Sequence, residues 1–528
     1  MRKKILSLAL ACLMIMTAFA TAIPVFAVTS NFTVTKTSNP LESTGCATLS
    51  AAITQAYTYG GATITLKEGL GTQDNPYKMT TAIVEETSSD TRTTITIEGN
   101  GNYITGSTTP FKFNTNDDIT VNNLHVKDLT ARAAEVYYGT TLKFSGCTFT
   151  LGAISNASND AGGYFRTPNK NSSGTDETAN SSVNTMIFEN CDIEVTANYS
   201  SYVVVFGNSS SKNAMNLVLN NTDVTATGNN MRFMWVGGAS SKTAPEISIH
   251  SSNIDICNHI LCTPYGYTAV ITGTAEDPTV IKSNNNKTVF ELHANTTRPA
   301  NIYIGDNVSI KSSTLYNANS KELNIYAAND KFWYKSDGTD LNNNYVAPTL
   351  EEGASVRTTD GSQGLRFKAT VAGEPATYGM LVTRTDKLTG EFTAKALADA
   401  EVSYKMAEAD KNNTVDGVYT VALTGISDEN VNTQYSARTY ATYNPATNVS
   451  VTVYGTYNAD KNARSIAYVA NEAYNDTKTE AEMAADDALA EIYMCKVTVE
   501  GETVYSRYGT TQRIALKKYS DMYDGEGK

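Results

Sequence analysis

The sequence predicts an all-β-dominated chain, built as a parallel β-solenoid followed by a smaller α+β or sandwich-like domain. Three observations lead to this fold class. The 528 residues are 41% hydrophobic and 18% charged, with 35 Gly and 12 Pro, which is typical of a folded chain. A short motif of alternating apolar residues recurs through the first two thirds of the chain, as in solenoids. After residue 352 this repeat disappears, which indicates a second domain.

The N-terminus has the order of a secretory signal peptide. A basic start, Met1–Lys4, is followed by the apolar run Ile5–Ala22 and by a small-residue site at Val25–Ala27. We therefore expect residues 1–27 to be a signal peptide, and the protein to be secreted and either extracellular or associated with the cell surface. An N-terminal membrane anchor is the alternative. No later apolar run is long enough for a span, so no membrane span is expected after cleavage.

Charge and cysteine content narrow the classes of partner and site. The 41 Lys and Arg against 54 Asp and Glu give a net charge of −13, which disfavours nucleic acid as a partner. Seven cysteines without a CxxC pair indicate neither a disulfide framework nor a structural zinc site. Cys147 and Cys191 occupy the same position in consecutive motifs, and stacked buried thiols are expected there.

The repeated motif has two alternating apolar positions, a polar break of Asn, Ser or Gly, and then a second alternation. A strand, a bend and another strand in each repeat fit a solenoid whose strands stack about 4.8 Å apart. The breaks are too short for helices, which disfavours a leucine-rich horseshoe. The motifs are ITIEGNGNYITG from Ile95, ITVNNLHVKDL from Ile119, LKFSGCTFTL from Leu142, MIFENCDIEV from Met186, LVLNNTDVTA from Leu217, ISIHSSNIDI from Ile247 and IYIGDNVSI from Ile302.

A helical pattern precedes the first motif. Leu49, Ala52, Ile53 and Ala56 form an apolar stripe, so a helix near residues 48–59 is expected to cap the solenoid. With the GATITLKEG strand, the TITIEGNG turn and the later Asn-containing turns, the chain resembles the right-handed parallel β-helix proteins of the pectate-lyase-like superfamily. The resemblance implies a right-handed parallel β-helix over residues 28–345 of a secreted bacterial protein, and it concerns architecture rather than one catalytic family.

The chain after the solenoid is predicted to form a separate domain. Residues 346–353 are expected to be a linker, and residues 354–528 a C-terminal domain of alternating strands with two helical patterns near its end. This domain is similar to an accessory domain of secreted and surface proteins of gut clostridia, on residues such as Gly364–Phe367 and Ser436–Tyr440. That resemblance implies a secreted or cell-surface setting, and it implies no particular activity.

Carboxylates offer one candidate site. The alternation after the polar break places Asp192, Glu194, Asp223, Asn253 and Asp255 on one outward face of the solenoid. The four acidic residues are the catalytic candidates, although no catalytic signature of sugar-cleaving β-helices is present and the catalytic residues stay unassigned. Asp192, Asp223 and Asn253 are the metal candidates, for Ca²⁺, which prefers oxygen ligands. A solvated acidic face without a ligand is the alternative.

Aromatic residues offer a second candidate site. Tyr137, Phe233 and Trp235, with His259 on the next turn, are predicted to form an exposed ligand-binding platform. Glu135 supports this orientation, because an inward-pointing glutamate would be costly. Flat aromatic rings stack on sugars and can anchor a glycan. The alternative is that these residues are covered or point inward.

Two functions from different classes follow. The favoured one is recognition of an extracellular polysaccharide or glycan by a monomeric, non-catalytic protein. The alternative is a polysaccharide lyase or glycoside hydrolase acting on a uronate-containing polymer through the acidic outer face. Fold alone does not decide between them.

Overall fold

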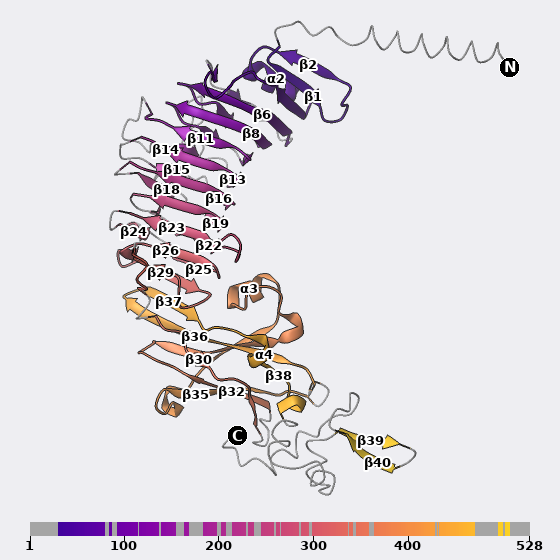
Figure 1. Ribbon diagram of the computed structural model, residues 1–528, viewed down its shortest axis with the longest axis vertical. Coiled ribbons are helices and arrows are strands. Elements are labelled where there is room, and N and C mark those ends of the chain that lie inside the picture. The colour runs from indigo at the N-terminus through magenta and orange to yellow at the C-terminus, as the bar shows by residue number, and fades with distance from the viewer. Residues whose placement is uncertain are drawn as a thin grey trace, which may run out of the picture. The chain divides into compact units, whose positions relative to one another are not determined.

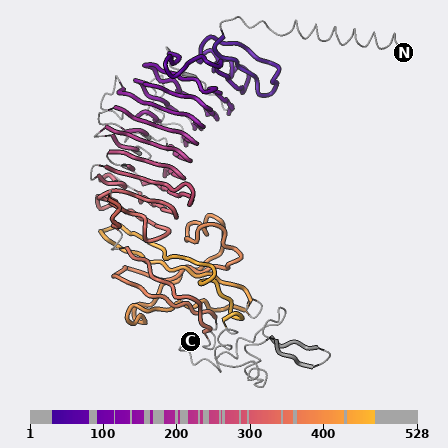
Figure 2. Tube along the Cα trace, in the orientation of Figure 1, coloured from indigo at the N-terminus to yellow at the C-terminus, as the bar shows by residue number. Residues whose placement is uncertain are grey.

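The structure is a computed structural model, and it confirms an all-β-dominated, parallel β-helix-like fold (Figure 1, Figure 2). The chain divides into two compact units, Met1–Leu217 with Thr222–Met231, and Val218–Asn221 with Arg232–Lys528. The residues that it describes are 30–79, 84–86, 92–114, 116–136, 139–154, 163–167, 183–197, 202–206, 214–228, 231–236, 244–257, 260–263, 266–284, 287–294, 298–335, 337–341, 345–357, 364–427, 430, 432–469, 495–499 and 502–506. The expected signal peptide, residues 1–27, lies outside these ranges.

The first unit begins with the expected cap. Helix α2 spans Leu49–Thr58, and the Thr48 side chain caps it by accepting a hydrogen bond from the Ala51 amide. The four residues of the predicted apolar stripe are all buried, and antiparallel strands β1 and β2 lie beside the helix. A helix therefore lies where the apolar stripe predicts one.

Parallel, in-register strands build the solenoid of the first unit. One ladder runs through β3, β6, β8, β10 and β13, a second through β8, β11, β14 and β17, and a third through β5, β7, β9, β12 and β15. The strands of this unit are β1 Phe32–Lys36, β2 Ser43–Cys46, β3 Ala62–Leu66, β4 Tyr77–Met79, β5 Val84–Glu86, β6 Thr94–Gly106, β7 Phe111–Asn114, β8 Asp118–Leu129, β9 Ala134–Val136, β10 Thr141–Ser145, β11 Thr148–Leu151, β12 Gly163–Thr167, β13 Val183–Glu189, β14 Asp192–Val195, β15 Tyr202–Phe206 and β17 Asp223–Ala226, while β16 Ala214–Asn220 belongs to both units.

The polar break of each motif is a tight bend in the left-handed backbone region. That region is strained for most residues and is tolerated best by Gly, Asn and Asp, which explains the composition of the break. The residues at these bends are Asn100, Asn123, Gly146, Asn190, Asn221, Ser251 and Asn307, with φ between 46° and 62°.

The alternation fills the coil with apolar side chains. Phe149, Ile193 and Val224 are buried at successive levels, as the alternation predicts. Phe144 is the centre of an aromatic cluster in the first unit, 5.3 Å from Phe111 and 5.4 Å from Phe188 between ring centroids. Burial of these rings provides the main stabilisation of the coil.

The second unit continues the same construction with three parallel ladders, one of β19, β22, β25 and β28, one of β20, β23, β26 and β29, and one of β18, β21, β24 and β27. Their bounds are β18 Arg232–Val236, β19 Glu246–His250, β20 Asn253–Ile256, β21 Leu261–Thr263, β22 Thr268–Thr272, β23 Thr279–Ser283, β24 Thr288–Leu292, β25 Ala300–Ile304, β26 Val308–Lys311, β27 Thr314–Asn317, β28 Leu323–Ala327 and β29 Trp333–Tyr334.

The C-terminal strands of the second unit attach directly to the last coil. Strand β37 pairs in parallel with β28, and β36, β33 and β34 follow in antiparallel order. A separate antiparallel sheet contains β30, β31, β32 and β35. The elements are β30 Thr349–Leu350, β31 Ser355–Arg357, β32 Gly364–Thr370, β33 Thr377–Arg384, η2 Thr385–Lys387, α3 Ala394–Asp399, β34 Tyr404–Glu408, η3 Lys411–Asn413, β35 Val418–Thr424, β36 Tyr435–Ala446, β37 Val449–Tyr454, α4 Ala459–Asn462, β38 Ala463–Arg464, β39 Cys495–Val499 and β40 Glu502–Ser506.

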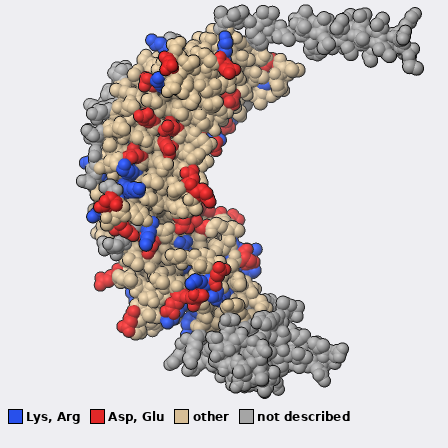
Figure 3. All heavy atoms as spheres, in the orientation of Figure 1, with Lys and Arg blue, Asp and Glu red and all other residues tan. Residues whose placement is uncertain are grey.

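The predicted boundary at residues 346–353 stays a prediction, and the two predicted helical segments, 462–476 and 479–494, lie largely outside the described residues. Among the described residues, no helix is long and apolar enough to cross a membrane. Acidic and basic side chains are interspersed on the face that Figure 3 shows, and no broad basic surface is visible there.

Candidate functional site

The acidic candidates point outward, as the alternation predicts. Asp192, Glu194 and Asp223 are exposed, and Asp192 lies directly opposite Asp223 on the neighbouring strand. Partial burial, and then the nearby charges of Asp223 and Glu194, raise the pKa of Asp192. Asn253 and Asp255 lie on β20 of the second unit, where Lys282 forms an ion pair with Asp255 at 2.9 Å.

These carboxylates do not form a recognisable metal centre. Among the described residues, no group of three or more His, Cys, Asp or Glu is arranged to hold a metal ion. Ca²⁺ requires six to eight oxygen ligands, whereas the in-register pair offers two side chains. The roles of Asp192, Asp223 and Asn253 as metal ligands, and of the four acidic residues in catalysis, therefore stay hypotheses.

The prediction that Phe233 belongs to an exposed aromatic platform is wrong. Its side chain is fully buried, at 0% exposure, and the adjacent Met234 is buried as well. Consecutive buried residues recur at the same point of this ladder, at Ile260–Leu261 for example, so both sides of the strand are covered there. Simple alternation therefore misassigned this strand.

The other platform residues have different positions. Trp235 is half-buried, and its ring makes an edge contact with exposed His293 at 6.2 Å between centroids. Tyr137 and His259 lie outside the described residues. The ligand-binding role of these three residues stays a prediction.

Glu135 is buried, and so are its two neighbours on β9, Ala134 and Val136. Arg166 lies opposite Glu135 on the next strand and donates a hydrogen bond at 2.6 Å, while Lys112 and Arg132 approach to 3.7 Å. Three cations compensate the cost of burying this carboxylate. Burial of a glutamate therefore does not reveal its orientation when its partners come from neighbouring strands.

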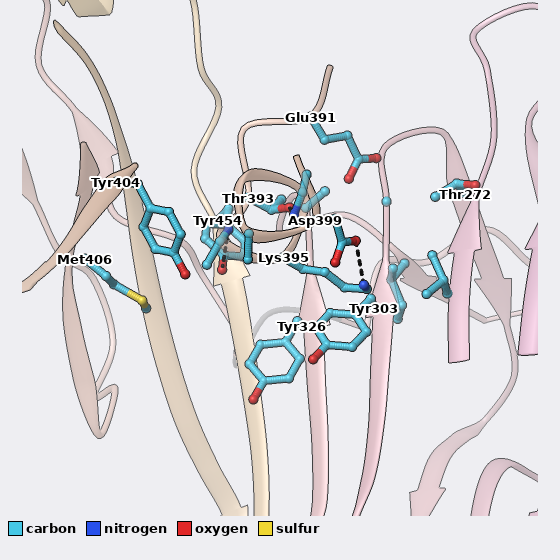
Figure 4. Close-up of a pocket in the computed structure, with 17 residues that line it drawn as sticks. Thr272, Tyr303, Tyr326, Glu391, Thr393, Lys395, Asp399, Tyr404, Met406 and Tyr454 are labelled. Carbon is cyan, nitrogen blue, oxygen red and sulfur yellow. Dashed lines mark hydrogen bonds and ion pairs between the residues drawn. The ribbon is translucent and has the colours of Figure 1, made fainter. Parts of the chain in front are cut away.

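A pocket of about 620 Å³ in the second unit is a further candidate site. Its size is in the range of small-molecule pockets. One wall is the outward surface of strands β25 and β28, and the other is the segment around α3 and strand β34 (Figure 4). Its lining residues are Val270, Thr272, Tyr303, Ile304, Gly305, Tyr326, Ala328, Glu391, Thr393, Ala394, Lys395, Ala396, Ala398, Asp399, Tyr404, Met406 and Tyr454.

Stacked tyrosines form the solenoid wall of this pocket. Tyr303 and Tyr326 are opposite each other on β25 and β28, and their rings are 5.0 Å apart with an 11° interplanar angle. Both point outward because the flanking residues of each strand, such as Ile302 and Ile325, are buried in the coil. Burial is the main cause of the raised pKa of each phenol, so both hydroxyls are neutral hydrogen-bonding groups near pH 7.

Helix α3 positions a cation against Tyr303. Thr393 caps the helix, and buried Leu397 anchors it in a cluster that contains Tyr454. Lys395 lies over the Tyr303 ring at 5.0 Å and pairs with Asp399 at 2.6 Å. Because Tyr326 and Lys395 cover Tyr303, the ring face of Tyr326 that points away from Tyr303 is the surface left for a ligand.

The opposite wall is apolar and exposed. Tyr404 and Met406 of β34 are 37% and 43% exposed, and they are two of the five large exposed apolar residues in the described chain. In Figure 4 both lie beyond Tyr326, on the side away from Tyr303. Tyr454 lies between these walls, and burial raises its pKa to about 12. We call the part of the pocket between Tyr326 and the side chains of Tyr404 and Met406 the slot; it is lined by aromatic rings, and their phenolic hydroxyls are available as donors.

The segment before α3 is fastened to the last coils by Glu391 and Arg438. Glu391 accepts a hydrogen bond from the Asp306 amide at 2.8 Å, and Gly305 leaves room for its carboxylate. Arg438 is 4% exposed and donates to the carbonyl oxygens of Gly455, Phe392 and Ala328. Burial is the largest cause of the raised pKa of Glu391.

Fold and pocket together define the class of protein, a parallel β-solenoid with an aromatic-lined pocket at the last coils of its second unit. Comparisons with protein-family models, with curated proteins and with solved structures found no match to the chain. The class therefore rests on the strand pairing and the pocket geometry.

Proposed function

We propose that the protein is a secreted bacterial glycan-binding protein that holds an extracellular polysaccharide in the pocket between Tyr326 and Tyr404. The observation that carries the proposal is the slot itself, with a supported tyrosine on one wall and exposed apolar side chains on the other. Aromatic faces bind the C–H faces of sugar rings, and hydroxyl groups orient them. The resemblance to pectate-lyase-like β-helices and the signal-like N-terminus support an extracellular setting.

Exposure of the slot also supports binding. Large apolar side chains grouped at a cavity commonly mark interaction sites, whereas isolated exposed ones do not. Tyr303 contributes as a support, since it stacks behind Tyr326 and fixes its ring. A preorganised ring loses little entropy when a ligand binds.

The test is a polysaccharide panel in affinity gel electrophoresis, followed by calorimetry on each glycan that retards the protein. Tyr326→Ala and Tyr404→Ala are expected to weaken binding at least about tenfold, a loss of about 1.4 kcal/mol. Tyr468→Ala is the matched control, because Tyr468 is an exposed tyrosine of the same unit that does not line the pocket.

Two results would contradict the proposal. One is a panel in which no glycan binds, or in which binding persists in both pocket variants. The other is concentration-dependent self-association that Tyr326→Ala abolishes, since a second copy of the chain would then be the occupant of the slot.

The second candidate is cleavage of a uronate-containing polymer through the acidic face. The in-register pair of Asp192 and Asp223 favours it, because a carboxyl group with a raised pKa beside a second carboxylate can serve as a general acid. Incubation with uronate polymers tests it, with absorbance at ~235 nm reporting the unsaturated product that β-elimination forms and reducing ends reporting hydrolysis. Loss of activity in Asp192→Asn but not in Tyr326→Ala would support this candidate.

A further inference from the structure

The charged groups around the slot point to the class of sugar that fits it. Three charged side chains line the pocket among the described residues, and these are Glu391, Lys395 and Asp399. Glu322 also acts on the slot, since its charge contributes to the raised pKa of Tyr326. Arg438 acts on Glu391 and Tyr454 in the same way, so three acidic groups lie at or near the slot with two cations, of which Lys395 lines the pocket.

Lys395, the cation that lines the pocket, already has an anionic partner. Lys395 forms an ion pair of 2.6 Å with Asp399, one turn further along α3, and its ammonium group lies over the Tyr303 ring. A ligand carboxylate or sulfate that shares this ammonium group with Asp399 would lie beside the Asp399 carboxylate. Otherwise it would lie near acidic side chains without a partner, and like charges in such positions oppose binding.

We infer that the slot selects neutral pyranose chains and rejects uronate and sulfated chains. This inference rests on the proposed function, and it deepens it by naming the substrate class. The apolar wall of Tyr326, Tyr404 and Met406 suits the C–H face of a neutral ring. Phenolic hydroxyls of neutral tyrosines, together with Thr393, supply hydrogen-bonding groups for sugar hydroxyls without adding charge.

The experiment uses matched pairs that differ only in charge. Each neutral oligosaccharide of the panel, of glucan, mannan and galactan type, is compared by calorimetry with the same oligomer oxidised at C6 to uronic acids. We expect the oxidised member to bind at least about tenfold more weakly, because its added carboxylate lies beside acidic side chains of the slot. High salt should reduce the difference, because it screens exposed charges.

A variant tests the cause of the selection. Asp399→Asn removes the carboxylate beside Lys395, so it should strengthen binding of the oxidised oligomer several-fold more than binding of the neutral one. Asp386→Asn is the matched control, because it removes an exposed carboxylate that pairs with Arg384 away from the pocket. The control should change neither affinity.

Failure of this inference is distinguishable from failure of the proposed function. Suppose that the oxidised member binds as tightly as the neutral one or more tightly, and that Tyr326→Ala abolishes this binding. The neutral-sugar inference is then overturned, while glycan binding in the slot stands. If Asp399→Asn keeps the same preference for neutral over oxidised oligomers, the Lys395–Asp399 pair is not the cause of the selection. If no member of any pair binds, the proposed function and this inference both fail.

Discussion

Arg438 is expected to hold the pocket wall to the last coil. Its guanidinium group donates to three backbone carbonyls that belong to different segments, at Ala328 in the coil, Phe392 before α3 and Gly455 after β37. Arg438→Met keeps much of the side-chain volume and leaves these carbonyls without this donor. A buried unpaired polar group costs about 1–3 kcal/mol, so we expect a loss of about 3–5 kcal/mol in the free energy of unfolding.

The control for this change is Arg384→Met. Arg384 is exposed and pairs with Asp386 at 2.9 Å, and an exposed pair contributes about 0–1 kcal/mol. Urea denaturation followed by circular dichroism measures both variants, and calorimetry with a glycan ligand measures the pocket. A loss below about 1 kcal/mol in Arg438→Met, with glycan affinity retained, would refute the reasoning because the carbonyls would then have other partners.

Three further changes test other parts of the structure. Asp192 has a raised pKa in the folded protein, so the stability of the fold should fall as the pH rises from the unfolded-state pKa of this carboxyl through its folded-state pKa. Asp223→Asn should lower the pKa of Asp192 in an NMR titration, because it removes a nearby negative charge. An unchanged pKa would contradict the predicted coupling. The hydrogen bond with Cys191, and then burial, raise the pKa of the Cys147 thiol. This thiol should therefore react with a thiol reagent only after unfolding, and fast labelling of the native protein would show that it is accessible. Gly305→Ala places a Cβ atom against the Glu391 carboxylate and should cost about 1–3 kcal/mol and weaken glycan binding, whereas wild-type affinity would show that this contact does not hold the wall.

The solenoid could be predicted because its rules are local. Each coil repeats an alternation of buried and exposed residues, and each bend needs a residue that tolerates a positive φ, such as Asn190 or Gly146. The stacked cysteines Cys147 and Cys191 are free and buried, as their shared motif position predicts. Local period and turn chemistry thus determine most of the coil.

The predictions for Glu135 and Phe233 were wrong because the burial of both side chains depends on residues far away in the sequence. The burial of Glu135 depends on Lys112 and Arg166, which are neighbours only after the strands stack. Phe233 is buried on a strand where both sides are covered, which alternation along one segment does not reveal. Orientation on this ladder therefore depends on tertiary packing rather than on the sequence of one strand.

The tyrosine slot was missed for a similar reason. One signal was present, because Tyr303 and Tyr326 each stand between two buried residues in IYI and IYA of successive coils. The other wall comes from Tyr404 and Met406, about eighty residues further along the chain. The parallel pairing of β37 with β28, together with the Glu391 and Arg438 contacts, brings that wall to the coil.

The central claim is that a sugar ring lies in the slot between Tyr326 and Tyr404. A crystal structure of the protein with the tightest-binding oligosaccharide of the panel tests it most directly. We expect a pyranose ring whose carbon atoms lie within about 4.5 Å of both tyrosine rings, the distance of apolar contact. A sugar bound instead at Asp192 and Asp223, or beside Trp235, with the slot empty, would contradict the claim.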